Sequence, residues 1–515
     1  MVSRSRRRCR KSNAPSRTGC APSPPTPAPL RVPPGETVPH ARPPGTILTR
    51  DWGCEIKINA IGHASYLFET AAGNVLTDPV FFDPFEGGVN VSYPPRVVDP
   101  ARLPRVDCIV LSHRHFDHFD IRTLSVLDRN AMVLYPDGET LIETALGELG
   151  YRRRRGLRPW SKARAGRLEI IATPSHVSWP ELGILVRDGV TTLWSLIDTV
   201  IDETVIAAVR EHVGQVDCLL APYSPIVQYE LRDPGQPKTL DAHEYQWMLT
   251  IPRLTQPRVV IPSAGGLRYA KAEWQNTYGF PVTPARYLDD LRHTAPDIDG
   301  VILDPGDCCR HVGERWRPSR RVLDYVATPA SFDGYADWQH DPAAGIPFAD
   351  TNPLESPPQE AYEFACRYVT GEMLDDLLHP ANAEALSAWR RWQVTWRLDL
   401  YAPRHAGVGS AGGPSRSWWL DFRPGTPTLR ETGPVEVAMR TAVAATGLYD
   451  LLHGRSSAYG YLFGDRTRHT ARIYLISEDG VRQPTDPVPE PLLTALTGPR
   501  DPDETYVAAQ LKRWR

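Results

Sequence analysis

The chain is 515 residues long, with 41% hydrophobic residues, 23% charged residues and a formal net charge of −3 at pH 7. A chain of this length can bury the cores of two or three domains. The near-neutral charge argues against a general nucleic-acid-binding protein, which needs a basic face. No segment approaches the roughly 20 apolar residues of a membrane-spanning helix. We therefore expect a globular protein with no transmembrane segment and no nucleic-acid partner.

The eight cysteines include no C-x-x-C pair, and Cys308 and Cys309 are adjacent in the sequence. Adjacent cysteines suit neither a structural zinc site nor an ordinary disulfide. Cys108 and Cys218 each precede an apolar run, which favours buried thiols. Because disulfides rarely form in a reducing compartment, this pattern predicts a cytoplasmic protein.

The first 45 residues begin with the basic run M-V-S-R-S-R-R-R-C-R-K and continue with many prolines. The apolar core that a secretory signal needs does not follow the basic run. This composition predicts a disordered basic and proline-rich tail over residues 1–45. A tether to nucleic acid or to a membrane is the alternative interpretation, and a start codon assigned too far upstream would give the same pattern.

From residue 55 onwards, segments typical of strands alternate with segments typical of helices. Strands are expected at 56–70 and 75–79 (joined by a hairpin turn at 71–74), 106–112, 131–137, 167–176, 183–189, 191–199, 216–223 and 257–263. Helices are expected at 121–127, 139–150, 204–213 and 241–255. This alternation predicts a layered α/β domain over residues 50–325.

The chain changes in character after a proline-rich segment at 326–357, which is typical of a linker. E-A-Y-E-F-A-C-R-Y-V and A-E-A-L-S-A-W-R-R-W favour helices, whereas Q-V-T-W-R-L-D-L-Y and S-W-W-L-D-F-R alternate like antiparallel strands. The segment 435–454 is interpreted as a helix pair ending at Gly454, and H-T-A-R-I-Y-L-I as one more strand. Residues 358–515 are therefore predicted to form a smaller α+β domain.

Three histidines and one aspartate lie within six residues of the loop after the strand at 106–112. The run is H-R-H-F-D-H, with His113, His115, Asp117 and His118. Alternate residues leaving a strand point to one side, so His113 and His115 can hold one ion while the last two residues turn towards a second. Imidazole and carboxylate groups are ligands for zinc, iron and manganese. A polar surface loop is the alternative, but this spacing arises rarely by chance.

The H-x-H-x-D-H run after a strand resembles the signature of the metallo-β-lactamase superfamily. G-H-A-S-Y-L-F-E-T at 62–70 and L-T-D-P-V-F at 76–81 resemble the opening of one branch of that superfamily. The branch includes ascorbate-6-phosphate lactonases and the phospholipase D that hydrolyses N-acylphosphatidylethanolamine. T-P-S-H at 173–176 and L-I-D-T at 196–199 fall where it keeps its next histidine and its bridging aspartate. The resemblance spans about residues 55–310 and implies an αββα sandwich.

Carried over position by position, the resemblance implies two divalent metal ions, with zinc favoured and iron or manganese as alternatives. One ion would be held by His113, His115 and His176, the second by Asp117 and His118, and Asp198 would bridge them. His176 has an alternative role as a turn residue after Pro174, and Asp198 as a helix cap. Asp78 fits a supporting role that holds the metal loop by hydrogen bonds, or else a D-P turn. His63 is expected to be a buried, hydrogen-bonded residue beside the site.

The sequence departs from the superfamily pattern at the last ligand. The superfamily usually supplies a further histidine after a strand near the end of the domain, but here S-A-G-G-L-R-Y (263–269) follows that strand. His243, Tyr269 or water would have to take the missing place. The second ion is therefore expected to be more weakly held than the first, exchangeable, or absent.

Two looser resemblances concern other parts of the chain. The 263–269 segment with D-P-G-D at 304–307 resembles the catalytic portion of CMP-N-acetylneuraminate hydroxylase, which also carries a Rieske cluster. A Rieske centre needs two Cys/His ligand pairs, and no C-x-H here is matched by a separate C-x-x-H. L-Y-D-L-L-H-G-R-S-S with a following R-I-Y resembles a sterol-carrier-like lipid-binding domain; a dimerisation or lid domain is the favoured alternative. Five tryptophans of this part line a groove or fill a core: Trp389, Trp392, Trp396, Trp418 and Trp419.

Metal-dependent hydrolysis is the leading functional hypothesis. A metal-bound hydroxide would cleave an ester, lactone, amide or phosphodiester bond in a small-molecule or lipid-like substrate. Asp117 and Asp198 would orient the water and accept its proton, and Arg268 is a candidate for stabilising the transition state, or else a surface cation. A diiron oxygen-activating enzyme of specialised metabolism and a non-catalytic binding protein are the alternatives. The sequence allows a homodimer but does not establish one.

Overall fold

The computed structural model describes residues 56–71, 73–226, 240–270, 273–276, 279–313, 315–329, 348–403, 414–423, 425–477 and 480–515. The predicted tail at 1–45 and the middle of the predicted linker at 326–357 lie outside these ranges. Gly53–Arg515 forms one compact unit. Within the described ranges, the helices are too short or too polar to cross a membrane.

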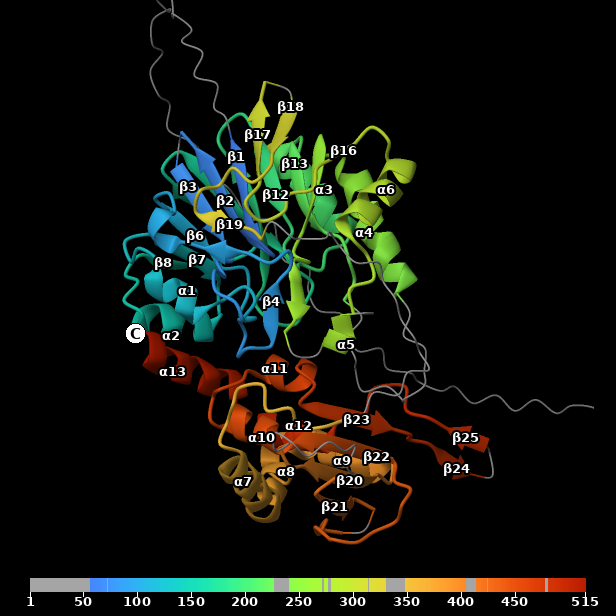
Figure 1. Cartoon of the computed structure of the whole chain (residues 1–515). Helices are drawn as coiled ribbons and strands as arrows, with labels where there is room; N and C mark the ends of the chain where they lie inside the picture. Colours follow the sequence, from blue (N-terminus) through green and yellow to red (C-terminus); the bar gives the residue numbers. More distant parts are fainter. Residues whose placement is uncertain are drawn as a thin grey trace, which may run out of the picture. The chain divides into compact units, whose positions relative to one another are not determined.

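The first large sheet contains eight strands in the order β18-β17-β1-β2-β3-β6-β7-β8 (Figure 1). The strands from β18 to β3 are antiparallel, and those from β3 to β8 are parallel. Their bounds are β1 Lys57–Gly62, β2 Ser65–Thr70, β3 Gly73–Thr77, β6 Cys108–Val110, β7 Met132–Pro136, β8 Arg154–Leu157, β17 Cys308–Val312 and β18 Arg315–Ser319.

The second large sheet contains seven strands in the order β16-β14-β13-β12-β11-β10-β9. It is antiparallel from β9 to β12 and parallel from β12 to β16. Its bounds are β9 Lys162–Ala165, β10 Leu168–Pro174, β11 Leu182–Arg187, β12 Thr192–Ser195, β13 Cys218–Pro222, β14 Val259–Ser263 and β16 Asp299–Gly300.

The two sheets pack face to face, and helices cover the outer face of each. Residues from both sheets share one buried core, for example Ile58 and Val110 with Ile170 and Ile261. Helices α1 (Ile121–Val126) and α2 (Thr140–Glu148) pack on the first sheet. Helices α3 (Glu203–Val213), α4 (Ala242–Thr255) and α6 (Pro284–Thr294) pack on the second. The predicted αββα sandwich is confirmed.

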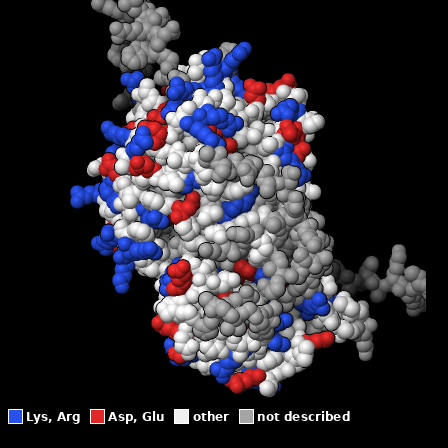
Figure 2. Space-filling view, viewed as in Figure 1, with Lys and Arg blue, Asp and Glu red and all other residues white. Residues whose placement is uncertain are grey.

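Helix starts in the sandwich follow from acidic caps in the sequence. Asp120, Asp202 and Asp241 each accept hydrogen bonds from the first free backbone N–H groups of α1, α3 and α4. The arginine-rich strand β8 was not predicted, because its residues 154 and 155 are both exposed instead of alternating. Figure 2 shows Lys and Arg gathered along the edge that holds β8, so the near-neutral net charge conceals a local basic edge.

The C-terminal region has a four-stranded sheet of its own, in the order β21-β20-β22-β23. Its strands are β20 Thr395–Tyr401, β21 Arg416–Asp421, β22 Met439–Ala444 and β23 Thr467–Ala471, followed by the hairpin β24 Leu475–Ser477 and β25 Gly480–Arg482. Its helices are α7 Pro358–Gly371, α8 Met373–Leu377, α9 Ala383–Arg391, α10 Ala445–Leu452, α11 Ala458–Phe463, α12 Pro491–Thr497 and α13 Pro502–Trp514. The predicted α+β composition is confirmed.

The predicted helix pair at 435–454 is half wrong. Its first half contains strand β22, and only the second half forms a helix, α10. Met439, Thr441 and Val443 are buried on β22, whereas Arg440 between them is exposed. That period of two was obscured by the helix-favouring alanines around it. Trp389, Trp396 and Trp418 are fully buried, which decides for a core and against a groove at these three positions.

Several short elements complete the connections between these layers. They are β4 (Asn90–Ser92) with β15 (Leu267–Tyr269), β5 (Val97–Val98) with β19 (Val326–Ala327), the short helix α5 (Glu273–Asn276), and the 3-10 turns at Pro100–Arg102 and Pro380–Asn382. The last helix, α13, lies against α1 and α2 (Figure 1). Its Tyr506, Val507 and Leu511 belong to the core outside the first sheet. The C-terminal region therefore contributes a helix to the packing of the sandwich.

Candidate metal centre

The histidine-rich run forms the loop between β6 and α1. Strand β6 ends at Val110, and the backbone then turns where the N–H groups of His118 and Phe119 donate to the carbonyl of His115, at 3.0 and 2.8 Å. His113 and His118 are fully buried. A turn that follows a buried parallel strand places these side chains at the carboxyl edge of the first sheet.

One group of candidate ligands consists of His113, His118 and Asp198, whose nearest ligand atoms all lie within 4.8 Å of one another. His118 Nε2 is 3.2 Å from Asp198 Oδ2. His115 joins the group through its Nδ1, which is 2.9 Å from His113 Nε2. The structure therefore brings together four of the six predicted ligands at this point.

A second group consists of His63, Asp117 and His118. His63 Nε2 is 3.3 Å from Asp117 Oδ2 and 3.3 Å from His118 Nε2. Asp117 Oδ2 and His118 Nε2 are 3.6 Å apart. His63 occupies the turn between β1 and β2 with a positive φ of 51°. Gly266 passes so close that a Cβ there would meet the His63 backbone nitrogen at 2.7 Å. His63 is buried and hydrogen-bonded beside the site, as expected, and it is also a member of the second group of candidate ligands.

Asp78 holds the metal loop in place, as predicted. It accepts hydrogen bonds from Ser112 N at 2.7 Å and Ser112 Oγ at 2.8 Å, and its Oδ2 is 3.0 Å from His118 Nδ1. Ser112 Oγ also lies 2.8 Å from His113 Nδ1. When one ring nitrogen of a histidine binds a metal, a hydrogen bond to the other ring nitrogen fixes the tautomer and orientation of the imidazole. Asp78 therefore leaves His118 Nε2 as the nitrogen that faces both groups.

His176 does not join either group in this structure. Its Nε2 pairs with Asp202 Oδ1 at 3.3 Å, and 47% of its side chain is exposed. Asp202 is also the N-cap of α3, so the contact with His176 places the turn after β10 beside the start of that helix. The role of His176 as a ligand stays a prediction.

Two buried carboxylates beside the metal loop were missed in the sequence. Glu181 Oε2 lies 4.0 Å from His113 Nδ1 and accepts hydrogen bonds from Ser175 and Trp179. Glu86 is buried, and it accepts hydrogen bonds from Asn90 at 2.8 Å and Ser457 at 3.5 Å. Neither lies in a recognisable motif, so only their burial in the folded chain reveals them.

The buried charges strongly perturb the histidines and aspartates. Burial opposes a charge on His118, but the carboxylates of Asp198 and Asp117 override it and raise the pKa of His118 well above its usual value. Burial, together with His118 and His115, lowers the pKa of His113. His118 holds the pKa of Asp198 at about 2 against the effect of burial, and lowers that of Asp117 further. Both aspartates are therefore carboxylates at neutral pH.

The donor set fits divalent metal ions. Among the described residues, no Lys or Arg forms an ion pair with Asp117, Asp198 or Glu86. A buried carboxylate keeps its negative charge when it is paired with a cation or binds a metal ion. Imidazole nitrogens and carboxylate oxygens within a few ångströms of one another are what zinc, iron or manganese require.

The segment that replaces the missing last histidine lies in β15 and the turn before it. The Arg268 guanidinium stacks on the rings of Tyr93 and Phe280, at 4.3 and 4.0 Å from their centroids. Arg268 therefore stacks on aromatic rings and belongs to neither group of candidate ligands. These contacts give no support to a role for Arg268 in transition-state stabilisation. His243 is exposed in the first turn of α4, outside both groups.

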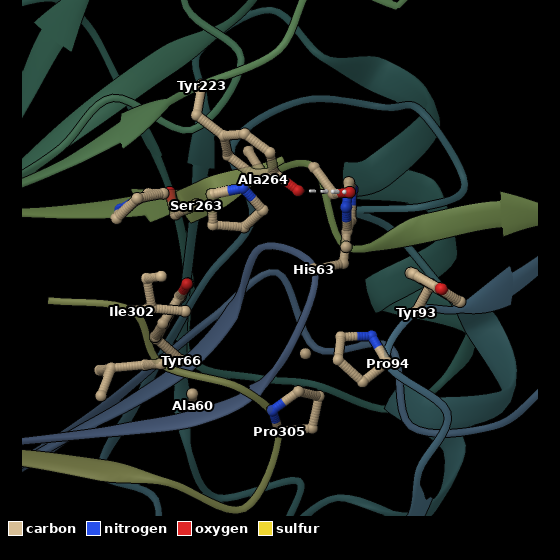
Figure 3. Close-up of a pocket in the computed structure, with 16 residues that line it drawn as sticks. Ala60, His63, Tyr66, Tyr93, Pro94, Tyr223, Ser263, Ala264, Ile302 and Pro305 are labelled. Atoms are coloured by element: carbon tan, nitrogen blue, oxygen red, sulfur yellow. Dashed lines mark hydrogen bonds between the residues drawn. The ribbon is translucent and has the colours of Figure 1, made fainter. Parts of the chain in front are cut away.

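A narrow cavity is lined by His63, Tyr66, Tyr93 and Tyr223, which Figure 3 shows around it. Its volume is about 20 Å³, which suffices for one water molecule. The Tyr223 hydroxyl donates to the carbonyl of Gly265 at 3.0 Å, the dashed line in Figure 3. A space of this volume is too small for a substrate.

Comparison with known proteins agrees with the fold. Residues 73–261 match the model of the beta-lactamase superfamily domain. Proteins of Mycobacterium tuberculosis named as Rieske 2Fe-2S iron-sulfur proteins are 26% identical over 303 residues, which cover 54% of this chain and 58% of theirs. N-acyl-phosphatidylethanolamine-hydrolyzing phospholipase D 1 of Caenorhabditis elegans is 27% identical over 142 residues, covering 26% of this chain and 35% of that protein. The chain thus spans little more than half the length of the Rieske relatives.

Two solved structures illustrate the range of similar proteins. CmlA, a diiron β-hydroxylase from Streptomyces venezuelae, is 19% identical with a TM-score of 0.35, covering 52% of this chain and 54% of CmlA. Igni18, a metallo hydrolase from Ignicoccus hospitalis, is 18% identical with a TM-score of 0.35, covering 50% of this chain and 99% of Igni18. The segment that matches the family model, residues 73–261, runs from β3 into β14 and so includes strands of both large sheets.

Proposed function

We propose that this chain is a metal-dependent hydrolase with a dinuclear centre. The observation that carries the proposal is the position of His118, whose Nε2 lies within 3.6 Å of Asp117 and within 3.2 Å of Asp198. The two ions, with zinc favoured and iron or manganese as alternatives, would be held by the two groups that share His118, with His115 as a further ligand. His176 would complete the set only if its side chain turned away from Asp202.

The residues around this centre suit the activation of water. Bound divalent ions would make hydroxide available at neutral pH and polarise the bond that is attacked. Asp117 and Asp198 stay ionised because their pKa values are depressed, so either carboxylate can orient a water molecule. The same two carboxylates are the proposed acceptors of its proton. Asp78 and Ser112 keep His118 and His113 in one orientation throughout.

We infer the substrate class from the centre and its surroundings. The chemistry suits an ester, lactone, amide or phosphodiester, and the phospholipase D relative supports the last of these. Trp179, 44% exposed, lies with its ring 5.9 Å from the His115 ring. A half-exposed indole beside the ligands offers a contact for the apolar part of a small-molecule or lipid-like substrate.

Elemental analysis of protein purified without added metal tests the proposal. Two zinc or manganese ions per chain, with turnover of bis(p-nitrophenyl) phosphate or p-nitrophenyl esters, are expected. His115→Ala should lose metal and turnover, whereas His293→Ala, which changes an exposed histidine on α6, should keep both. Unchanged metal content and turnover in His115→Ala would refute the proposal.

A dinuclear iron enzyme that activates oxygen is the second candidate, and the Rieske relatives favour it. Among the described residues, Cys308 and Cys309 cannot both ligate one iron of a Rieske cluster, because on β17 they belong to the cores on opposite faces of the sheet. The electron donor would then be a separate protein. Two irons per chain with a visible absorption band would favour this candidate over hydrolysis.

Three further expectations remain proposals. Cys108, Cys218, Cys308 and Cys309 are buried free thiols, which supports a reducing, cytoplasmic location. The absence of a nucleic-acid partner is expected in spite of the basic edge at β8, because the net charge is near zero. Light scattering of the purified protein would distinguish a monomer from a homodimer.

A further inference from the structure

The C-terminal region contacts the metal loop at the two residues of H-R-H-F-D-H that are not candidate ligands. Arg114, between the first two histidines of the run, pairs with Asp501 at 3.4 Å and Asp503 at 3.8 Å, at the start of α13. Phe116, two residues further on, packs on Tyr506 of α13 with ring centroids 4.6 Å apart. The candidate ligands of the run therefore alternate with side chains that contact α13.

The contact between Phe116 and Tyr506 is part of a hydrophobic core. Both side chains are buried, and they belong to the cluster that also contains Phe119 and Val507. Protein interiors are close-packed, so a ring in such a cluster moves only if its neighbours move with it. The position of Phe116 is therefore coupled to the position of α13.

The hydroxyl of Tyr506 also holds the loop between β3 and β4. Gly87 N donates a hydrogen bond to this hydroxyl at 2.9 Å. Gly87 has a φ of 66°, and a Cβ there would meet the carbonyl oxygen of Arg455 at 3.1 Å. One side chain of α13 thus contacts two loops of the sandwich, the metal loop through its ring and the Gly87 loop through its hydroxyl.

The start of α13 is itself fixed by the rest of the C-terminal region. Asp501 caps α13 by accepting a hydrogen bond from Asp503 N at 2.9 Å. Asp503 Oδ1 accepts from the backbone N–H of Ala458, the first residue of α11, at 3.1 Å. Gly454, which follows α10, lies so close to α13 that a Cβ there would meet the carbonyl oxygen of Thr505 at 2.5 Å. The position of α13 therefore depends on both α10 and α11.

The sandwich anchors the two ends of the histidine-rich run. Asp78 accepts a hydrogen bond from Ser112 N at 2.7 Å just before the run, and its Oδ2 is 3.0 Å from His118 Nδ1 at the end of the run. The middle of the run is where α13 makes its contact, through Phe116. Because the candidate ligands on either side of Phe116 are its immediate neighbours in the chain, a shift of this residue moves them as well.

We propose that Tyr506 is a positioning residue of the metal centre, which holds Phe116 and thereby keeps His115 and Asp117 in the arrangement that binds the two ions. The inference rests on the proposed function for the presence of those ions. Divalent metal ions accept imidazole and carboxylate ligands within narrow limits of distance, so a small displacement of this loop weakens binding. The C-terminal region is then part of the framework of the metal centre.

The same contacts couple metal binding and the docking of α13 in both directions. If docking of α13 raises the affinity for metal ions, bound ions must stabilise that docking by the same free energy. Removal of metal from the full-length protein should therefore quicken hydrogen exchange in α13. Exchange should keep its rate in α9, whose buried residues Ala385 and Trp389 belong to the C-terminal core. Equal exchange of α13 with and without metal would contradict the coupling.

Cobalt(II) binding to the full-length protein tests the positioning role, because the visible absorption bands of cobalt report how its ligands are arranged. Tyr506→Leu removes the ring on which Phe116 packs, so metal affinity should fall by about 10–100-fold, with altered bands. Tyr506→Phe keeps the ring and should keep the wild-type affinity and bands, although its melting temperature should fall because Gly87 N loses its acceptor. Phe116→Leu truncates the other ring and should reproduce the effect of Tyr506→Leu, and it decides the question if Tyr506→Leu does not fold.

Tyr461→Leu is the matched control, because Tyr461 is a buried aromatic residue of the C-terminal core outside the cluster that contains Phe116. This control should lower the melting temperature and leave cobalt affinity and bands unchanged. Wild-type affinity and bands in both Tyr506→Leu and Phe116→Leu would overturn the inference, and so would equal changes in Tyr461→Leu. A wild type that binds two ions without turnover of p-nitrophenyl substrates would refute the hydrolase alone, whereas a wild type that binds no cobalt would refute both proposals.

Discussion

The sandwich and the C-terminal region differ in how their buried acidic side chains are paired. In the C-terminal region, buried Asp450 is paired with buried Arg466 at 2.6 Å, and Asp350 accepts from the backbone and side chain of Thr446. At the metal loop, Asp117 and Asp198 lie against His63 and His118, with no Lys or Arg among the described residues paired to them. A buried acid with its own cation holds a fold together, whereas buried acids beside histidines mark a place for a bound cation.

The two regions also differ in how their residues are spaced along the chain. Four candidate ligands lie within the six residues 113–118, whereas the residues that link the C-terminal region to the loop are spread from Arg455 to Tyr506. Yet both sets meet at one loop, because its ligands alternate with the two residues that contact α13. The C-terminal region therefore contacts the loop that carries the candidate ligands, and four variants test the site, the C-terminal region and this contact.

Removing the His118 side chain should have the largest effect of the four variants, and the quantity affected is metal affinity. His118→Ala removes one residue that belongs to both groups of candidate ligands. Losing a residue that only hydrogen-bonds to a ligand typically lowers metal affinity by about 10–100-fold. We expect a larger loss for His118→Ala, roughly 1,000-fold. Asp78→Asn, which changes an outer partner of His118, should stay within about 10–100-fold. Competition with a chromogenic chelator measures both. Equal losses in the two variants would contradict a shared ligand.

Removing Tyr506 tests whether the two regions unfold together. Tyr506→Ala empties a buried site against Phe116, and we expect a loss of about 3–5 kcal/mol of stability. The loss should appear in the same thermal transition that releases the metal, followed by calorimetry and a metal-sensitive dye. Tyr474→Ala, at a side chain that is 53% exposed, is the control. A separate early transition with metal retained would show that the regions are independent.

Mild acid should destabilise the C-terminal region through His469. Burial lowers the pKa of His469, opposed by Glu490, and its Nδ1 lies 3.1 Å from Thr441 Oγ1. A depressed pKa in the folded state gives stability that is present above the unfolded value of about 6.5 and is lost as pH falls towards the folded pKa. Melting temperature should therefore fall below about pH 6.5. His469→Gln should flatten this dependence, and an unchanged profile would assign it to other groups.

The smallest effect is expected from Arg114→Ala. The pair with Asp501 and Asp503 is about one-third exposed, so its loss should cost about 0.2–1 kcal/mol. Hydrogen exchange should quicken in the first turn of α13, next to the metal loop. Arg515→Ala, which removes the pair with Glu148 at the other end of α13, should quicken exchange only there. No change at the first turn would mean that Phe116 and Tyr506 alone hold the helix.

Much of the sandwich and the centre of the site were accessible from the sequence. The strand at 106–112 and the run H-R-H-F-D-H predicted a loop of ligands, because local spacing alone sets which residues leave a strand together. The helix predicted at 204–213 forms α3, and the structure adds that Asp202 caps it. The strand β22 was misassigned because its alternation was short and embedded among alanines.

The sequence by itself determined that a strand would present three histidines and an aspartate at one loop, since that depends on residues adjacent along the chain. Only the tertiary structure decided that His63 enters the site, that His176 turns to Asp202, and that Glu86 is buried beside the loop. It also decided that Tyr459 meets Tyr269 across 190 positions of sequence. Such contacts depend on how separate elements pack, and no local pattern encodes that packing.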